Sequence, residues 1–294
     1  MKLFLMKKSY KLYLLVYIFT FLWPVFVLAE PTIDLSEKNI LQGEPLLVWV
    51  SGLNRDENIE KAYVSGYKLY FNDYLGKKVA IWGVSLESSV GEKKISIILS
   101  SGKEIDSTFN ILKRQKEEAP LSIPEKLGGN SKSSAQKLVN NLAIENQVIS
   151  SVTNKVGTTS TYWATPFRAP LLSPTITDHF GYIRDTSGQK ITHKGVDFHA
   201  DKGTQVLSIN RGIVRLAKKF KIYGNTVIVD HGSGVYSMYM HLSKISVNKG
   251  ELVDVGQKVG LSGDSGYAES PHLHLSVRVN GNSIDPEKFI NMFK

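Results

Sequence analysis

The stretch Pro271-His272-Leu273-His274-Leu275-Ser276-Val277-Arg278-Val279 alternates polar and apolar side chains. A period of two is typical of a β-strand, in which alternate side chains point to the same face of the sheet. His272 and His274 would then lie on one face, roughly 6.5–7 Å apart along the strand. Two neighbouring imidazoles can reach one small site, either as two metal ligands or as one ligand and one acid/base group. The stretch predicts a β-sheet that carries chemistry on one face.

A second polar cluster is His193-Lys-Gly-Val-Asp197. Gly195 and the β-branched Val196 disfavour a helix. In a fully extended chain the Cα atoms of His193 and Asp197 would be roughly 13 Å apart, which is near the limit for two ligands of one Zn²⁺, so the backbone should bend near Gly195. A carboxylate between Val196 and Phe198 needs a partner or a metal. The alternative is a solvent-facing His–Asp pair in a loop.

Together, His193, Asp197 and His274 would supply two imidazoles and one carboxylate. Three protein ligands with an open position for water are more typical of a catalytic than of a structural zinc site. A bound zinc would lower the pKa of that water and polarise a scissile carbonyl. His241 and His272 would remain as neutral imidazoles that exchange protons and steady an oxyanion. The spacing therefore predicts a hydrolytic site with one Zn²⁺ per chain.

The chain has seven histidines, and all lie between His179 and His274. We expect scaffold roles for the three outside the predicted site. His179 precedes Phe180-Gly181 and is expected to form hydrogen bonds in a loop. His199 follows Asp197 at an even offset, so it could lie near the site in a packing role. His231 opens a glycine-rich turn and is expected to be structural.

Residues 30–112 contain short β-rich runs separated by glycines, a pattern that predicts a β-sandwich-like accessory domain. Residues 113–160 are predicted to be a linker with one helix. Charged residues, prolines and glycines break any periodicity over 113–130. A helical stripe then follows over 132–153, with Glu145 interrupting it. Residues 161–294 return to β character. The predicted fold class is mainly β: a β-sandwich-like domain, a helical linker and a C-terminal antiparallel β-sheet domain. The runs are Leu46–Val50, Lys61–Val64, Tyr67–Phe71, Val79–Trp82, Ile95–Leu99 and Thr108–Leu112, and the stripe is Leu138, Leu142, Ile149 and Val152.

Residues 1–29 have the pattern of a secretory signal peptide. Four lysines precede an uncharged apolar run over 12–28, and Val27-Leu-Ala29 offers a cleavage site. An uncleaved membrane anchor is the alternative, although Trp23-Pro24 would interrupt a spanning helix. In either case the rest of the chain is expected outside the cytoplasm, in the periplasm or cell envelope. A membrane partner follows only if the segment is uncleaved.

The formal net charge is +9, of which the four N-terminal lysines supply +4, residues 30–160 nothing and residues 161–294 the remaining +5. A basic domain outside the cytoplasm suggests an anionic neighbour such as an envelope polymer or a membrane. Solubility alone is the alternative explanation. Nucleic acid is a poor partner for an exported chain. The absence of cysteine excludes disulfides and thiolate chemistry.

Over about residues 163–289 the chain resembles the lysostaphin/LytM-type zinc endopeptidases of bacterial cell walls. Besides the two polar clusters and Pro271-His-Leu-His274, the resemblance rests on the order and spacing of several shorter motifs. These are Phe180-Gly181, Gly203-Thr-Gln-Val206, Gly224-Asn225-Thr-Val-Ile-Val-Asp-His231-Gly232, Tyr239-Met-His241-Leu, Gly256-Gln-Lys-Val-Gly260, Asn280-Gly281 and Asp285-Pro286.

The resemblance implies that His193, Asp197 and His274 bind zinc and that His241 and His272 are catalytic. It also implies an endopeptidase that cuts stem peptides or cross-bridges of peptidoglycan. Two departures bear on cleavage specificity: no glycine directly precedes Pro271, and Leu275-Ser276 replaces the family's Phe-Glu.

Two other functions fit parts of the sequence. One is a non-catalytic or weakly active relative that binds peptidoglycan and activates another wall hydrolase; such relatives typically lack metal ligands, whereas all five site positions are present here. The other is a biotinyl or lipoyl carrier, suggested by the glycines of residues 250–266, but the acceptor lysine motif is missing. Residues 30–160 could bind the wall, bind an envelope protein, or cover the groove until released.

Overall fold

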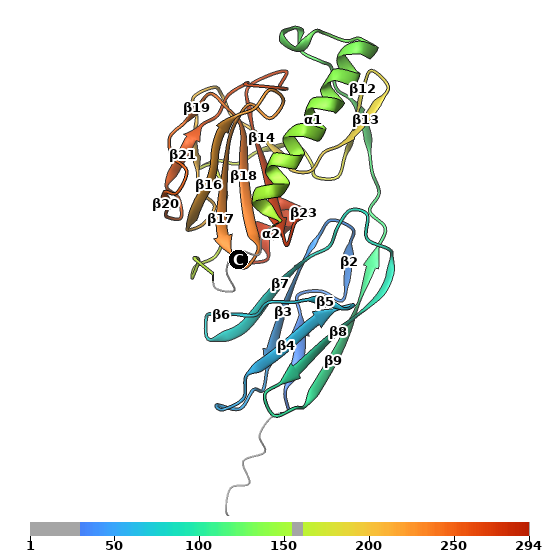
Figure 1. The fold of residues 1–294 in the computed structure, drawn as a ribbon, viewed down its shortest axis with the longest axis vertical. Coiled ribbons are helices and arrows are strands. Elements are labelled where there is room, and N and C mark those ends of the chain that lie inside the picture. Colours follow the sequence, from blue (N-terminus) through green and yellow to red (C-terminus); the bar gives the residue numbers. More distant parts are fainter. Residues whose placement is uncertain (1–29, 155–160, 294) are drawn as a thin grey trace, which may run out of the picture.

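The computed structural model describes residues 30–154 and 161–293. It is mainly β, with antiparallel sheets that form two stacked bodies and one long helix beside the upper body (Figure 1). The predicted fold class is confirmed. Within the described ranges no helix is long and apolar enough to cross a membrane. The predicted signal peptide or anchor, residues 1–29, lies outside them.

The N-terminal body is a β-sandwich. One sheet has the order β1 (Thr32–Leu35), β3 (Pro45–Ser51), β7 (Lys77–Gly83), β6 (Asn72–Tyr74), and the other has β2 (Asn39–Leu41), β9 (Glu104–Leu112), β8 (Gly91–Leu99), β4 (Ile59–Val64), β5 (Tyr67–Lys68). In β8, Ile95, Ile97 and Leu99 point inward and are fully buried. The strand predicted at 67–71 is shorter than expected, because the buried Leu69 lies where the chain crosses from one sheet to the other.

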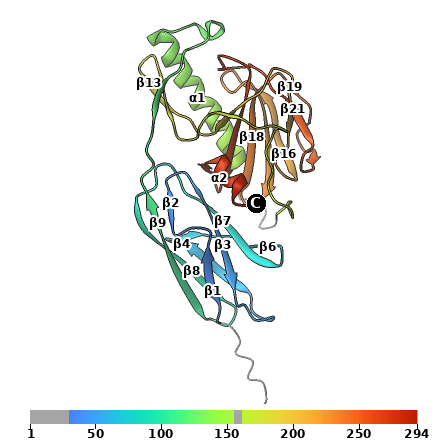
Figure 2. The same cartoon turned by 180° about the vertical axis from the view of Figure 1, so that it is seen from behind.

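The C-terminal body is built on one large antiparallel sheet (Figure 2). Its order is β11 (Ile176–Asp178), β14 (Val196–His199), β22 (His272–Val279), β18 (Val235–Leu242), β17 (Asn225–Gly232), β16 (Gly212–Lys219), β20 (Leu252–Val253), and β23 (Asn282–Ile284) pairs with β22. A small sheet contains β15 (Gln205–Leu207), β21 (Lys258–Leu261) and β19 (Lys244–Ile245). A hairpin of β12 (Ile183–Thr186) and β13 (Gln189–Thr192) lies beside them, and α2 (Pro286–Asn291) follows β23.

The large sheet has one apolar face and one face that carries the predicted chemistry. In β22, Leu273, Leu275, Val277 and Val279 are fully buried in the main core. His272, His274, Ser276 and Arg278 alternate with them and therefore point to the opposite face. The period of two that the sequence shows is thus the period of the sheet.

The linker lies against the second face. Its strand β10 (Glu118–Pro120) pairs in parallel with β12, and a short turn, η1 (Glu125–Leu127), precedes the helix α1 (Lys132–Thr153). Ser131 caps α1 by accepting a hydrogen bond from Ser134 N. The helix buries Ile149 in a small cluster with Ile228, Met238 and Met240 of the sheet. The bounds of α1 match the predicted helix at 132–153.

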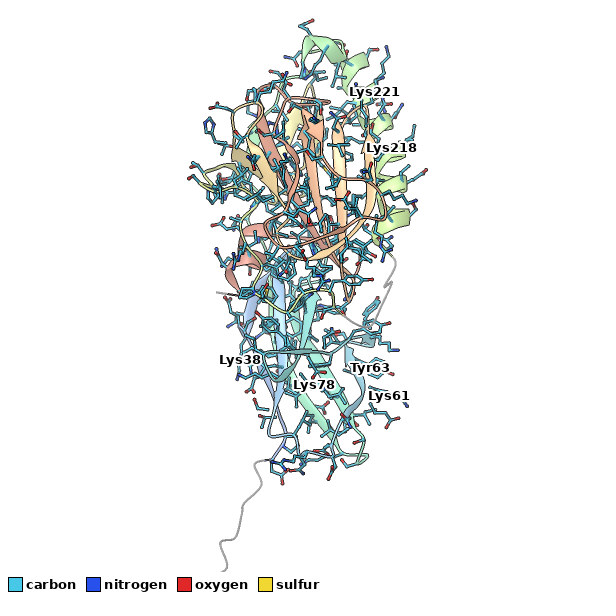
Figure 3. All side chains as sticks on the ribbon, turned by 90° about the vertical axis from the view of Figure 1, so that its left-hand side faces the viewer. Lys38, Lys61, Tyr63, Lys78, Lys218 and Lys221 are labelled. Carbon is cyan, nitrogen blue, oxygen red and sulfur yellow. The ribbon has the colours of Figure 1, made fainter. Side chains whose placement is uncertain are left out.

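The two bodies share a packed contact. Tyr74 of the sandwich stacks on Trp163, with ring centroids 4.9 Å apart. Gly83 lies so close to β22 and β23 that a Cβ there would be 2.9 Å from Val279 Cβ. Asp285 N donates to Gly43 O at 2.7 Å. Figure 3 shows the sandwich below the larger body, with Lys38, Lys61 and Lys78 on the sandwich and Lys218 and Lys221 beside α1.

Candidate metal centre

Strand pairing brings the two predicted clusters together. Asp197 of β14 is directly opposite His274 of β22, so their side chains share the second face of the sheet. His193 lies just before β14, and the backbone bends at Gly195. A Cβ at Gly195 would be 2.4 Å from His274 Nε2 and 2.5 Å from Leu275 O. Only glycine therefore allows His193 to approach the two strands this closely.

Three ligand atoms converge at this place. His274 Nδ1 is 2.7 Å from Asp197 Oδ1, His193 Nε2 is 3.2 Å from the same oxygen, and the two ring nitrogens are 3.0 Å apart. All three residues are buried. These separations are close to those expected for donors that share one small ion at about 2.0–2.2 Å per bond.

The outer hydrogen bonds of the two rings show why a cation fits between them. His193 Nδ1 donates to the carbonyl of His179 at 2.8 Å. Ser276 Oγ donates to Lys194 O at 2.5 Å, so it accepts from His274 Nε2 at 3.1 Å. In neutral imidazoles the inner nitrogens then have lone pairs and no proton. Two such lone pairs and a carboxylate oxygen face one another, which is the donor set of a metal ion.

Arg184 binds the remaining carboxylate oxygen of the set. Its Nη2 contacts both Asp197 Oδ2 and Asp178 Oδ2, and its Nε donates to Asp178 at 2.9 Å. The arginine and the acid fix the orientation of Asp197 and leave Oδ1 for the ion.

His241 and His272 lie next to the three donors. Their ring centroids are 4.9 Å apart, and His272 Nε2 is 3.9 Å from Asp197 Oδ1. Each uses Nδ1 to donate to a backbone carbonyl at 2.8 Å, that of Ser265 for His241 and that of Ser270 for His272. The neutral form of each ring therefore has an unprotonated Nε2. His241 also has a left-handed backbone conformation, φ 58°, a strained geometry that recurs at functional sites.

Burial favours the neutral forms of His241 and His274. It lowers the pKa of His274 to about 4, although Asp197 acts in the opposite direction. Burial also lowers the pKa of His241 well below its usual value, and the neighbouring His272 and His274 lower it further. Neutral imidazoles are the form that binds a metal or accepts a proton.

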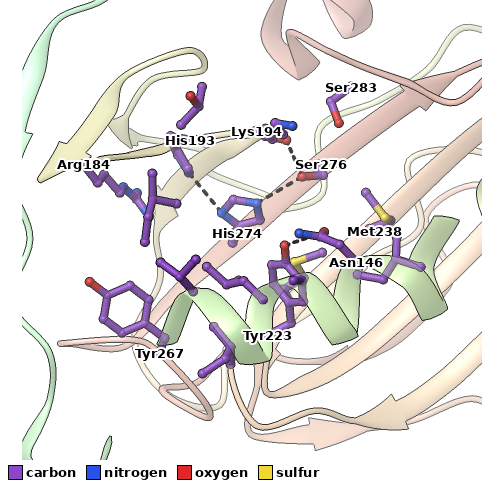
Figure 4. A pocket seen from close by; sticks show the side chains of 18 of the residues that line it. Asn146, Arg184, His193, Lys194, Tyr223, Met238, Tyr267, His274, Ser276 and Ser283 are labelled. Carbon is purple, nitrogen blue, oxygen red and sulfur yellow. Dashed lines mark hydrogen bonds between the residues drawn. The ribbon is translucent and has the colours of Figure 1, made fainter. Parts of the chain in front are cut away.

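A cavity of about 420 Å³ opens beside the donors, between the sheet and α1. Figure 4 shows His193, His274 and Ser276 on one side of it and Asn146 of α1, bonded to Tyr223, on the other. The helix and the metal centre are thus two walls of one cavity. A peptide that reaches the donors along this face has to share the space with α1.

The other three histidines lie outside the cluster of five. The carbonyl of His179 orients His193, and its ring lies 3.6 Å from Glu287. His199 is exposed and pairs across the strands with His272. His231 is fully buried, donates to Arg211 O and contacts Ser237 Oγ, and burial lowers its pKa to about 4.

The structure brings all five predicted site residues, His193, Asp197, His241, His272 and His274, into one cluster. Sequence reasoning missed the groups that orient them, namely Asp178, Arg184 and the hydroxyl of Ser276. Asp178 and Arg184 come from β11 and β12 and have no local pattern that marks them. Ser276 lies two residues after His274 on β22, so the two side chains share one face of the strand. This spacing was the sequence feature that could have identified Ser276.

This geometry places the donor set of a metal ion, two imidazoles and a carboxylate, on one face of an antiparallel sheet. Residues 191–286 match the model of Peptidase family M23. The resemblance predicted from the sequence is confirmed for this part of the chain, which is similar to Peptidase family M23.

Among curated proteins, the chain is 40% identical over 96 residues to peptidoglycan DD-endopeptidase ShyA of Vibrio cholerae, a segment that covers 33% of this chain and 22% of that protein. It is 34% identical over 118 residues to DD-carboxypeptidase/endopeptidase Mpg of Neisseria meningitidis, and this segment covers 40% of this chain and 27% of that protein. The chain thus spans about a quarter of these relatives. A crystal structure of a Pseudomonas aeruginosa protein assigned to peptidase M23 shares the fold, with TM-score 0.62, 24% identity, and coverage of 86% of this chain and 96% of that one.

Proposed function

We propose that this protein is a zinc-dependent endopeptidase that hydrolyses peptide bonds of peptidoglycan, in stem peptides or cross-bridges. The observation that carries the proposal is the set of three inward lone pairs on His193, Asp197 and His274, with two further imidazoles beside it. The family match supports a peptidase, and the names of the relatives support a peptidoglycan substrate.

His193, Asp197 and His274 would hold one zinc ion per chain. When bound, zinc lowers the pKa of a water and polarises the scissile carbonyl. His241 is suited to accept a proton from the attacking water, because burial keeps its ring neutral and its Nδ1 is already committed to Ser265 O. His272, which is less buried and lies 3.9 Å from Asp197 Oδ1, is placed to steady the oxyanion and to pass a proton to the leaving amine.

We further propose the organisation that the sequence predicts. Residues 1–29 would direct export to the periplasm or cell envelope, residues 30–112 would be an accessory domain, 113–160 the linker and 161–294 the endopeptidase domain. The net charge of +5 on the last segment supports an anionic polymer as its neighbour.

The test is incubation of the purified protein with intact peptidoglycan, with and without a chelator, followed by mass analysis of the products. We expect new amino and carboxyl termini from the zinc-loaded protein and none after chelation. An absence of new termini from protein shown to contain one zinc per chain would support the interpretation as a binding or activating relative.

A further inference from the structure

Glu145 of α1 interrupts the apolar stripe of the helix, and it is 6% exposed. Its carboxylate accepts hydrogen bonds from three consecutive backbone N–H groups. They belong to Lys221 at 2.8 Å, Ile222 at 2.9 Å and Tyr223 at 3.0 Å. Successive N–H groups that converge in this way form a nest, a concave backbone site for anions. A carboxylate from the helix occupies it.

The nest belongs to the wall of the catalytic cavity. Ile222 and Tyr223 line the same cavity as His241 and His274. Tyr223 O accepts from His241 N at 3.1 Å, and Ile222 O accepts from Tyr267 N at 2.7 Å. The conformation of the nest is therefore held from the side of the peptidase domain, so its N–H groups would still converge if α1 were absent.

The attachment of α1 is made of side-chain contacts that can be replaced one by one. Besides Glu145, Asn146 accepts from Tyr223 Oη at 2.9 Å and Thr153 accepts from Arg278 at 2.8 Å. Ile149, with the partly buried Val148 and Val152, supplies apolar contacts. A peptide in the groove could offer the same kinds of groups: a carboxylate, amide oxygens and a small apolar side chain.

The surroundings of the nest are basic. Lys218, Lys219 and Lys221 are all exposed at this end of β16, and Figure 3 shows Lys218 and Lys221 beside α1. Such a cluster raises the local concentration of anionic ligands. An anion that approaches this end of the groove meets the lysines first and the nest behind them.

We propose that the N–H groups of Lys221, Ile222 and Tyr223 form a carboxylate-binding subsite of the substrate groove, and that Glu145 occupies it as an internal competitor of a substrate carboxylate. This inference rests on the proposed function, because it assigns the subsite to the same groove. Backbone nests are a known means of capturing peptide carboxylates. Release of α1 would open the subsite and the cavity together.

The binding test uses the full zinc-loaded chain and two probes, N-acetyl-D-alanyl-D-alanine and its C-terminal amide. Glu145→Ala empties the nest, and Gln147→Ala, an exposed change on the same helix, is the matched control. Amide NMR shifts of Lys221, Ile222 and Tyr223 report occupancy. We expect the acid probe to shift the three backbone amide signals of Glu145→Ala. It should bind the control at least about tenfold more weakly than it binds Glu145→Ala. It should also bind Glu145→Ala at least about tenfold more tightly than the amide probe does.

Glu145→Gln guards against a trivial loss of folding, because it keeps the shape of the side chain and weakens only its charge-assisted hydrogen bonds. It should bind the acid with intermediate affinity and keep a cooperative thermal transition. If the nest amides of Glu145→Ala and Glu145→Gln, both folded, do not respond to millimolar acid probe, the subsite does not exist.

Turnover of peptidoglycan separates this inference from the proposed function. We expect Glu145→Ala to cleave at least a few-fold faster than Gln147→Ala. Binding of the acid probe without turnover by any zinc-loaded variant would refute the peptidase function and keep the carboxylate site. Turnover without any response of the nest amides would refute the subsite alone.

Discussion

Ser276 provides a sharp test of how the proposed zinc ligands are oriented. Its hydroxyl accepts from His274 Nε2 at 3.1 Å and donates to Lys194 O at 2.5 Å, and the residue is buried. Ser276→Ala removes both contacts. His274 then loses the acceptor that keeps its proton on Nε2. Without that acceptor, the tautomer with a lone pair on Nδ1, which is the form that binds a metal, is no longer favoured.

The expected loss follows from these two contacts. Replacing a hydrogen-bond partner of a metal-bound histidine lowers metal affinity by about 10–100-fold, or about 1.4–2.8 kcal/mol. The unpaired carbonyl of Lys194 would cost a further ~1–3 kcal/mol of folding free energy. Arg184 and Asp178 still fix Asp197 in the variant, so the site should weaken rather than vanish.

The assay is competition for zinc between the protein and a chromophoric chelator, beside thermal unfolding of the apo and zinc-loaded forms. Ser276→Thr, which keeps the hydroxyl, is the matched control and should stay closer to the original affinity. A zinc affinity for Ser276→Ala within twofold of the unsubstituted protein would show that the assigned tautomer of His274 is wrong.

Three further outcomes follow from the same geometry. Asp197→Ala should lose both zinc and turnover, whereas His272→Ala should keep most of the zinc and lose at least about 100-fold in turnover. Metal analysis measures the bound zinc and product release measures the turnover. Full zinc content in Asp197→Ala would overturn the ligand set. The pKa of His231 is about 4 in the folded chain and about 6.5 in the unfolded chain. As the pH falls, the unfolded state therefore binds the proton first, and the free energy of unfolding should drop by up to about 3 kcal/mol from pH 6.5 to 4. In urea titrations, the free energy of unfolding of His231→Gln should depend less on pH, and an equal dependence would contradict this account. Gly195→Ala should cost ~1–3 kcal/mol and much of the zinc affinity, because its Cβ would be 2.4 Å from His274 Nε2; an unchanged melting temperature would refute that close approach.

The parts of the structure that repeat regularly could be predicted from the sequence. The period of two in β22 and the spacing of His193, Asp197, His272 and His274 are local patterns, whereas His241 follows chiefly from the family resemblance. The helix at 132–153 is also a local pattern, and the structure reproduces it from Lys132 to Thr153. The apolar face of β22 decides which way His272 and His274 point. That decision requires only the alternation of a strand and the burial of Leu273 and Leu275.

The groups that orient the site could not be predicted, because each acts across a long sequence separation. Arg184 contacts Asp197 from a neighbouring hairpin, and Asp178 contacts Arg184 from the edge strand of the sheet. An arginine or an aspartate in a short polar strand usually faces solvent. Only the pairing of β11 with β14 and the position of the β12–β13 hairpin bring these charges to the metal centre.

Glu145 shows how a flaw in a sequence pattern can be its most informative residue. A helix that serves only as a lid for an apolar core would present apolar side chains at each buried position. The stripe of α1 that faces the sheet instead runs Glu145, Ile149, Thr153, at intervals of four, and each polar member has a specific partner in the groove. The buried guanidinium of Arg278 meets hydroxyl groups there, and Nε has no partner among the residues that the structure describes. Beside the apolar cluster of Ile149, Val148 and Val152, these polar groups attach α1 to the sheet, and a ligand in the groove would compete for the same partners. A groove shaped for an anionic peptide would present cationic and N–H groups to its own helix when that helix fills it. The carboxylate of Glu145 in the nest and the incompletely paired Arg278 beside α1 fit this expectation.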